Sequence, residues 1–234
     1  MEELREPRNY FSILRAIAQG RTRLNEIAQG AGIGDATTVA RYLDILQQMR
    51  LITRRVPATE TQPEKSKKGI YQIDDHFLRF WFRYVHPNQS SLDLGLADAI
   101  LQQRIKPDLD HFVATAFEEA AITFMGRLAQ AGELDFFPER IGGWWNRDAE
   151  IDVLAVNLSE KIALVGECKW TVHPVGTSVL DDLKQKSEIL MKDHDIKKIQ
   201  FALFSRNGFT SDLEDKSKSE GIHLFAVHTL VNRV

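Results

Sequence analysis

Apolar residues recur at helical spacing in three short segments near the start of the chain. In residues 9–19 the apolar positions form one helical face, and Gly20 follows where a helix commonly ends. A second, shorter helix is predicted around Leu24, Ile27 and Ala28, and the small residues 30–34 interrupt it with a tight turn. Asp35 is a preferred N-cap residue for a third helix, whose apolar stripe is Val39, Tyr42, Leu43, Leu46 and Met49. The pattern therefore predicts three helices that share a core.

Two segments that alternate like strands follow, at residues 51–56 and 69–73. The segment between them is rich in Pro, Glu and Lys. Three helices followed by two such strands are typical of a winged helix-turn-helix, which we place at residues 1–75.

This first module carries the side chains that we expect to approach DNA. The polar side of the third helix is the predicted recognition face, with Thr37, Thr38 and Arg41. Phosphate contacts are expected from the wing, with Arg54, Arg55, Lys65, Lys67 and Lys68. Winged helices also serve as docking or dimerisation modules, and Asp44 offsets the charge of Arg41, so that alternative stays open.

Residues 76–108 differ in character because aromatic side chains crowd their beginning. We expect the aromatic cluster, which includes Phe77, Phe80, Trp81 and Tyr84, to pack at a seam between two domains, with base stacking as the alternative. A further helical segment at residues 92–103 is expected to end before Pro107. We therefore interpret residues 76–108 as a helical linker.

Residues 109–234 alternate between helical and strand patterns and form a second predicted domain. A long apolar helix at 109–128 precedes strands at 136–145, 150–156 and 161–170, and a helix at 178–192 follows them. A strand at 198–204, a helix at 211–220 and a strand at 222–227 complete the order. This order predicts a mixed sheet flanked by helices, so the expected fold class is α/β (α+β).

Composition and charge limit what these two domains can be. The chain has 234 residues, 43% of them apolar and 27% charged, and no apolar run long enough for a membrane span, so we expect a cytoplasmic protein without a membrane partner. The single cysteine, Cys168, cannot form an internal disulfide. Up to Ile73 there are 12 Lys and Arg against 8 Asp and Glu, and the rest of the chain has 18 against 25. A basic first part joined to an acidic second part favours contact of the first part with phosphates.

Candidate chemistry lies in two neighbouring strands of the second domain. Asp152 stands in an otherwise apolar strand, where a carboxylate requires a partner, water or a metal. In the next strand, alternation places Glu167 and Lys169 on one face and Cys168 on the other. Two carboxylates can hold Mg²⁺ or Mn²⁺, and a lysine beside them can stabilise charge on a phosphate. The alternative is a strand-end cap at Asp152 and an exposed ion pair in the next strand.

In this order of residues the sequence resembles the PD-(D/E)XK (restriction-endonuclease-like) superfamily, whose core is α-β-β-β-α-β. The resemblance implies metal-binding acids at Asp152 and Glu167, a catalytic lysine at Lys169 and a further metal-binding acid from the first helix at Glu118, with Glu119 as the competing choice. Ile151 stands where the family has a proline. A polar residue of the next helix often joins such sites, and Lys184 or Gln185 could fill that role.

The resemblance extends over nearly the whole chain to the C-terminal half of archaeal-type (AAA-like) prokaryotic ATPases. It rests on the order of the winged helix, residues 77–81, Ala116-Phe117-Glu118, Trp144-Trp145 and Glu150-Ile151-Asp152. It implies a partnership with an AAA-like ATPase domain or subunit. No phosphate-binding G-x-x-x-x-G-K-[ST] loop occurs in the sequence, so we expect no ATP hydrolysis by this chain.

Two functional hypotheses of different class follow from these patterns. The first is a DNA-binding module joined to a metal-dependent nuclease-like domain, and it could act as a homodimer because cleavage of duplex DNA requires two cuts. The second is a catalytically silent docking or regulatory module, or a transcription regulator. The seven histidines are scattered, and we assign none of them to a metal or a general base.

Overall fold

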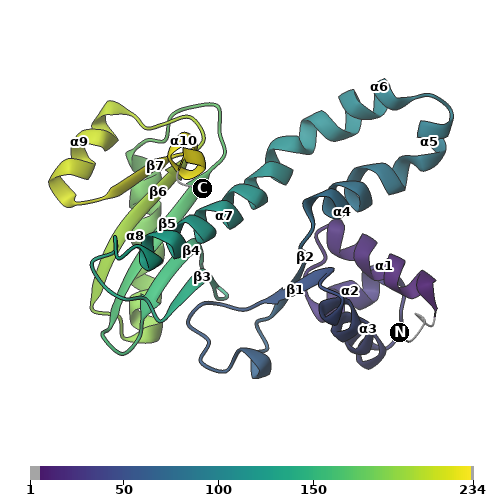
Figure 1. Cartoon of the computed structure of the whole chain (residues 1–234), viewed down its shortest axis with the longest axis horizontal. Coiled ribbons are helices and arrows are strands. Elements are labelled where there is room, and N and C mark those ends of the chain that lie inside the picture. The colour runs from purple at the N-terminus through teal and green to yellow at the C-terminus, as the bar shows by residue number, and fades with distance from the viewer. Residues whose placement is uncertain (1–5, 233–234) are drawn as a thin grey trace. The chain divides into compact units, whose positions relative to one another are not determined.

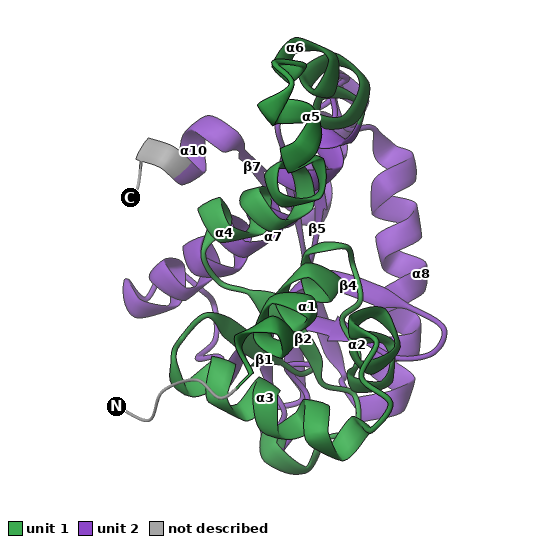
Figure 2. Cartoon of the chain, turned by 90° about the vertical axis from the view of Figure 1, so that its right-hand side faces the viewer, with its two compact units in different colours: residues 1–56, 63–107 green, residues 57–62, 108–234 purple. Residues whose placement is uncertain are grey.

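The computed structural model describes residues 6–232 and divides them into two compact units. The first unit contains the chain up to Val56 together with Pro63–Pro107, and the second contains Pro57–Gln62 together with the chain from Asp108 onward (Figure 2). The short segment Pro57–Gln62 therefore belongs to the second unit, although it lies in the sequence between two strands of the first.

Three helices build most of the first unit. They are α1 (Pro7–Ala18), α2 (Leu24–Ala31) and α3 (Ala36–Gln48). Their apolar faces meet in one core that includes Ile13, Ile27 and Leu43, all with no exposed surface. Met49 departs from the predicted stripe, because it lies beyond the end of α3 and is 47% exposed.

Glycine and aspartate set the ends of these helices. Helix α2 continues through Gly30, and Gly32 is the residue that caps its end. The backbone angle φ of Gly32 is 70°, which residues with a Cβ atom rarely adopt. The predicted interruption of the helix therefore comes two residues later than expected. The carboxylate of Asp35 accepts hydrogen bonds from the amides of Thr37 and Thr38 at the start of α3. The predicted N-cap is confirmed.

A two-stranded antiparallel sheet follows the three helices. Strand β1 (Ile52–Arg55) pairs with β2 (Ile70–Ile73), and Ile52 lies opposite Ile73. Both of these isoleucines are buried in the core of the helices, which fixes the face that the sheet turns inward. The loop between the strands contains one short 3₁₀ helix, η1 (Pro63–Lys65).

The aromatic segment after β2 is helical and packs on α1. It consists of α4 (His76–Phe80), a π-helical turn η2 (Trp81–Val85) and a 3₁₀ turn η3 (His86–Asn88). Phe82 is buried in the core of the first unit, and its ring lies 5.6 Å from that of Phe11. Trp81, which was expected to pack at a seam, is partly buried against the same core.

The helical segment before the second unit is longer and more broken than predicted. It contains α5 (Gln89–Asp93), α6 (Ala97–Ile100) and a π-helical stretch η4 (Leu101–Ile105), which leads directly into α7 (Lys106–Gln130). Pro107 was expected to end a helix, but it lies in the first turn of α7. Proline has no amide hydrogen, and Pro107 stands where the π-helical stretch passes into the α-helix.

The second unit has a five-stranded mixed sheet with the order β3-β4-β5-β6-β7. The strands are β3 (Arg140–Trp145), β4 (Glu150–Asn157), β5 (Ile162–Lys169), β6 (Lys198–Ser205) and β7 (His223–Ala226). The first three are antiparallel, and β5, β6 and β7 are parallel (Figure 1). Strand β3 begins four residues later than predicted.

Helices cover both faces of this sheet and bury two apolar layers. Helix α7 contributes Phe117, Ala121 and Phe124 to one layer, which also contains Cys168. Helix α8 (Thr177–His194) contributes Leu180, Leu183 and Leu190 to the other layer, together with Val165. Helices α9 (Ser211–Glu220) and α10 (Val227–Asn232) complete the unit, and only α10 was not predicted. The predicted helix and strand order and the mixed sheet are confirmed.

The segment Pro57–Gln62 packs against the outer strand β3. The amide of Ala58 donates to the carbonyl of Gly143 at 2.8 Å, and Ala58 belongs to the core on the α8 side. Among residues 6–232, no helix combines the length and apolar character needed to cross a bilayer.

Candidate active site

The acids and the lysine predicted from the strand pattern come together in the second unit. Asp152 lies in β4 and Glu167 and Lys169 in β5, and the ladder between these strands pairs Val153 with Gly166. Cys168 is buried in the layer under α7, whereas Val165 packs under α8. The predicted separation of Glu167 and Cys168 onto opposite faces is therefore confirmed.

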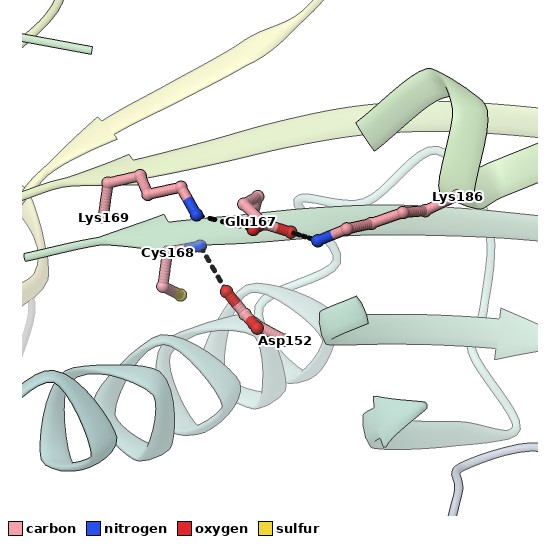
Figure 3. Close-up of polar contacts among 5 residues, drawn as sticks. All are labelled: Asp152, Glu167, Cys168, Lys169 and Lys186. Atoms are coloured by element: carbon pink, nitrogen blue, oxygen red, sulfur yellow. Dashed lines mark hydrogen bonds and ion pairs between the residues drawn. The ribbon is translucent and has the colours of Figure 1, made fainter. Parts of the chain in front are cut away.

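Three polar contacts define the site (Figure 3). The Oδ2 atom of Asp152 accepts a hydrogen bond from the backbone amide of Cys168 at 2.8 Å. The ammonium group of Lys169 lies 2.7 Å from Oε1 of Glu167. The ammonium group of Lys186 lies 2.8 Å from the other oxygen, Oε2. Each oxygen of Glu167 thus has its own positive partner.

Lys186 is the residue that sequence reasoning missed. The two candidates from this helix were Lys184 and Gln185, but Lys184 forms an ion pair with Glu220 at 2.6 Å, and Gln185 is exposed. Lys186 lies three residues after Leu183 and four before Leu190, which are both buried against the sheet. That spacing places Lys186 beside the inward face of α8 and is the sequence signal that could have identified it.

Burial and a neighbouring negative charge make Asp152 hard to ionise. Burial, followed by the charge of Glu167, raises the pKa of Asp152 from 3.8 to about 6, although the Cys168 amide and the two lysines act in the opposite direction. Burial alone would lower the pKa of Lys169, but the hydrogen bond and the charge of Glu167 outweigh it and raise that pKa. The site therefore strongly favours a positive charge near its two carboxylates.

Burial makes the thiol of the cysteine between these residues hard to ionise. Burial raises the pKa of the Cys168 thiol well above its usual value, and the charges of Asp152, Glu118 and Glu167 add to the effect. A thiol that stays protonated is neither a nucleophile nor a good metal ligand.

Glu118 does not complete a three-acid site in this structure. It lies in α7, on the face of the sheet where Cys168 is buried, whereas Glu167 pairs with Lys186 of α8 on the other face. Within residues 6–232, no group of three or more His, Cys, Asp and Glu side chains comes together to hold a metal ion. Of the two competing acids, Glu118 is the one whose charge acts on the Cys168 thiol. Its catalytic role stays a prediction.

Gly166 allows the two strands and the next one to approach closely at the site. A Cβ atom at this position would lie 3.0 Å from the ring of Phe204 and 3.1 Å from Cβ of Val153. The missing side chain of Gly166 therefore avoids a close contact in the strand, one residue before Glu167.

Trp144 and the histidines lie outside this set of contacts. Trp144 has no exposed surface, and its Nε1 atom donates to Nε2 of His194 at 3.2 Å, so it packs inside the second unit. His173 is exposed, and its carbonyl oxygen accepts a hydrogen bond from the hydroxyl of Thr171.

The candidate recognition residues of the first unit are at the start of α3. Thr37 and Arg41 are exposed, and Thr38 is half-buried. The hydroxyl of Thr38 donates to Asp35 at 2.7 Å, and the guanidinium group of Arg41 donates to that hydroxyl at 3.4 Å. These side chains therefore form one polar group at the N-terminus of the helix.

The two arginines of β1 have different surroundings. The guanidinium group of Arg54 is held inside the loop between β1 and β2, where it donates to the carbonyl oxygens of Pro63, at 2.8 Å, and Ser66. Arg55 donates to the side chain of Gln72 at 3.0 Å. The phosphate contact expected of Arg54 stays a prediction. The three loop lysines, Lys65, Lys67 and Lys68, are exposed as expected.

Comparisons with known proteins identify relatives but no activity. Residues 81–189 match the model of a family, DUF234, described as archaeal and bacterial proteins of unknown function. This region contains Asp152, Glu167, Lys169 and Lys186. The chain is also 36% identical over 216 residues to the uncharacterized protein MJECL04 of Methanocaldococcus jannaschii. The match covers 92% of this chain and 44% of that relative, so the chain spans less than half of its length.

Two solved structures are similar only at a low level. Protein VC1899 from Vibrio cholerae is 12% identical with a TM-score of 0.31, over 97% of this chain and 55% of that chain. An O-methyltransferase of neocarzinostatin biosynthesis, in complex with S-adenosyl-L-homocysteine, is 16% identical with a TM-score of 0.23, over 94% of this chain and 64% of that chain. At these TM-scores neither likeness carries an argument about fold or chemistry.

Proposed function

We propose that the chain is a DNA-binding, metal-dependent nuclease module. In this reading the first unit is a winged helix-turn-helix that binds DNA, and the second is a PD-(D/E)XK-type domain that hydrolyses phosphodiester bonds. The proposal rests above all on one observation. Two carboxylates and a lysine, predicted from strand pattern alone, lie on adjacent strands with Lys169 bound to Glu167 at 2.7 Å.

The side chains of this site fit a hard divalent cation such as Mg²⁺ or Mn²⁺. Carboxylate oxygens are the ligands that such ions prefer, and Mg²⁺ typically takes only one or two of them from a protein. The raised pKa of Asp152 supports the fit, because a carboxylate that is costly to ionise next to Glu167 is stabilised by a nearby cation. Asp152 and Glu167 would hold the ion, which would supply Lewis-acid chemistry and an activated water.

Residues of the protein would bind and orient the phosphate. Lys169 is protonated and 36% exposed, so its ammonium group can face both Glu167 and a phosphate oxygen. It would orient the phosphate and offset the negative charge that builds up as water attacks. The predicted phosphate contacts of the first unit are the three loop lysines, whose exposure supports that role.

Partners follow from the same proposal. DNA is the substrate class, and we propose that the module acts with an AAA-like ATPase domain or subunit. The match to MJECL04 covers 44% of that relative.

The test is cleavage of duplex and branched DNA by the metal-loaded protein. We expect Mg²⁺- or Mn²⁺-dependent cleavage that Asp152→Ala abolishes. The matched control is Asp148→Ala, which removes an exposed aspartate from the turn just before β4 and should cleave like the parent. An Asp152→Ala protein that cleaves as well as the parent would refute the assignment.

One observation favours a second candidate, a catalytically silent module. Both oxygens of Glu167 are bound by lysines of the same chain, which balances its charge without any metal. Titration calorimetry separates the two readings, because a silent module would bind neither Mg²⁺ nor Mn²⁺.

A further inference from the structure

Lys186 is unusual because it gives a second positive partner to a carboxylate that already has one. Glu167 has a side chain that is only 7% exposed, and Lys169 and Lys186 each hold one of its two oxygens. A buried carboxylate needs a counter-charge, and one lysine already supplies it. The second lysine therefore has an effect beyond neutralising Glu167.

The charge balance of the whole site shows what that effect is. Asp152 and Glu167 carry two negative charges when both are ionised, and Lys169 and Lys186 carry two positive charges. The site without metal is thus electrically neutral. Both oxygens of Glu167 already have an ammonium partner, so a divalent cation that takes one of these oxygens would displace one of the two lysines.

Lys169 and Lys186 reach Glu167 from different elements, and their side chains are 36% and 29% exposed. Lys169 lies in the same strand as Glu167, two residues away, and in the proposed function its ammonium group faces the phosphate. Lys186 extends to the site from the neighbouring helix α8 (Figure 3). Rotation of that side chain toward water would free the oxygen Oε2 of Glu167 without disturbing the strand.

We infer that Lys186 is the internal counter-ion that a divalent metal displaces from Glu167, so that this lysine lowers the metal affinity of the site. The inference rests on the proposed function, since it concerns the same metal site. Lys186 is a positioning residue in this account, because it acts through Glu167. It holds the carboxylate in place when metal is absent and competes with the ion when metal is supplied.

The test is the affinity of the chelator-treated full chain for Mn²⁺, measured by titration calorimetry. Lys186→Met removes the competing charge and should tighten Mn²⁺ binding by about tenfold, at the low end of typical couplings between two sites. Lys186→Arg keeps the charge and should restore an affinity near that of the parent. The matched control is Lys184→Met, which lies on the same helix but removes the ion pair with Glu220, and it should leave Mn²⁺ affinity unchanged.

The outcomes separate this inference from the proposed function. If Lys186 only supported the structure, its loss would weaken Mn²⁺ binding. Mn²⁺ binding by Lys186→Met that is equal to or weaker than that of the parent would therefore overturn the inference, and the nuclease proposal would still stand. If no variant and no parent protein bound Mn²⁺, both would fall. Thermal unfolding without metal gives a second measurement. Lys186→Met should melt at a lower temperature than the parent, and saturating Mn²⁺ should raise its Tm more than that of the parent.

Discussion

The buried carboxylate of Asp152 should make the metal-free protein less stable at neutral pH than at mildly acidic pH. Its pKa rises from 3.8 to about 6 in the folded protein, chiefly through burial and then through the charge of Glu167. Between these two pH values the folded state binds more protons than the unfolded state. The free energy of unfolding therefore falls as pH rises through this range, and the full penalty is present above about pH 6.

The change that isolates this effect is Asp152→Asn. Asparagine keeps the shape and an oxygen that can accept from the Cys168 amide, but it carries no charge. At about 1.4 kcal/mol per pKa unit, the difference between 3.8 and about 6 corresponds to about 3 kcal/mol. We therefore expect Asp152→Asn to be about 2 to 3 kcal/mol more stable than the parent at pH 7.5, and to approach the parent near pH 4.

The assay is urea unfolding of chelator-treated proteins at several pH values between 4 and 7.5. The control Asp148→Asn changes an exposed aspartate and should follow the parent at every pH. Saturating Mg²⁺ or Mn²⁺ should stabilise the parent but not Asp152→Asn, because only the parent keeps both carboxylates. The reasoning is refuted if Asp152→Asn is less stable than the metal-free parent at pH 7.5, or if the difference between them does not change with pH.

Three further predictions concern packing, a side-chain hydrogen bond and DNA contact. Gly166→Ala should lower the free energy of unfolding by about 1 to 3 kcal/mol in urea, because the new Cβ atom would lie 3.0 Å from Phe204. The control is Gly126→Ala in α7, where the new Cβ atom would have no neighbour within 4 Å, and it should be neutral or stabilising. Trp144→Phe should lower stability by about 1 kcal/mol through loss of the hydrogen bond to His194, and a variant as stable as the parent at pH 8 would contradict this. Replacing the three loop lysines by Gln should weaken duplex binding and reduce its salt slope by about one for each lysine that contacts a phosphate, and an unchanged slope in fluorescence titrations would exclude them from the interface.

Local sequence patterns predicted most elements of the fold because they depend on neighbours along the chain. The three helices and two strands of the first unit, and the helix and strand order of the second, follow from spacing of apolar residues. The predicted helix bounds were wrong where the same residue type can stand at either end of a helix. Pro107 could end a helix or begin one, and the structure places it in the first turn of α7, directly after a π-helical stretch.

Side-chain partners across elements were predicted less well than the elements. No local pattern predicted that the charged group of Arg54 binds two carbonyl oxygens of the neighbouring loop. The segment Pro57–Gln62 was expected to be part of the wing, yet it belongs to the second unit, where Ala58 pairs with Gly143. Such pairings depend on chain segments far apart in sequence, which periodicity does not report.

The sequence by itself determined which residues of the candidate site share a strand and a face. Period-two alternation places Glu167 and Lys169 together and Cys168 apart, and this follows from the geometry of any β-strand. Only the tertiary structure decided the rest of the site. It brought Lys186 to Glu167, because the packing of α8 on the sheet determines which helix side chains can reach that carboxylate.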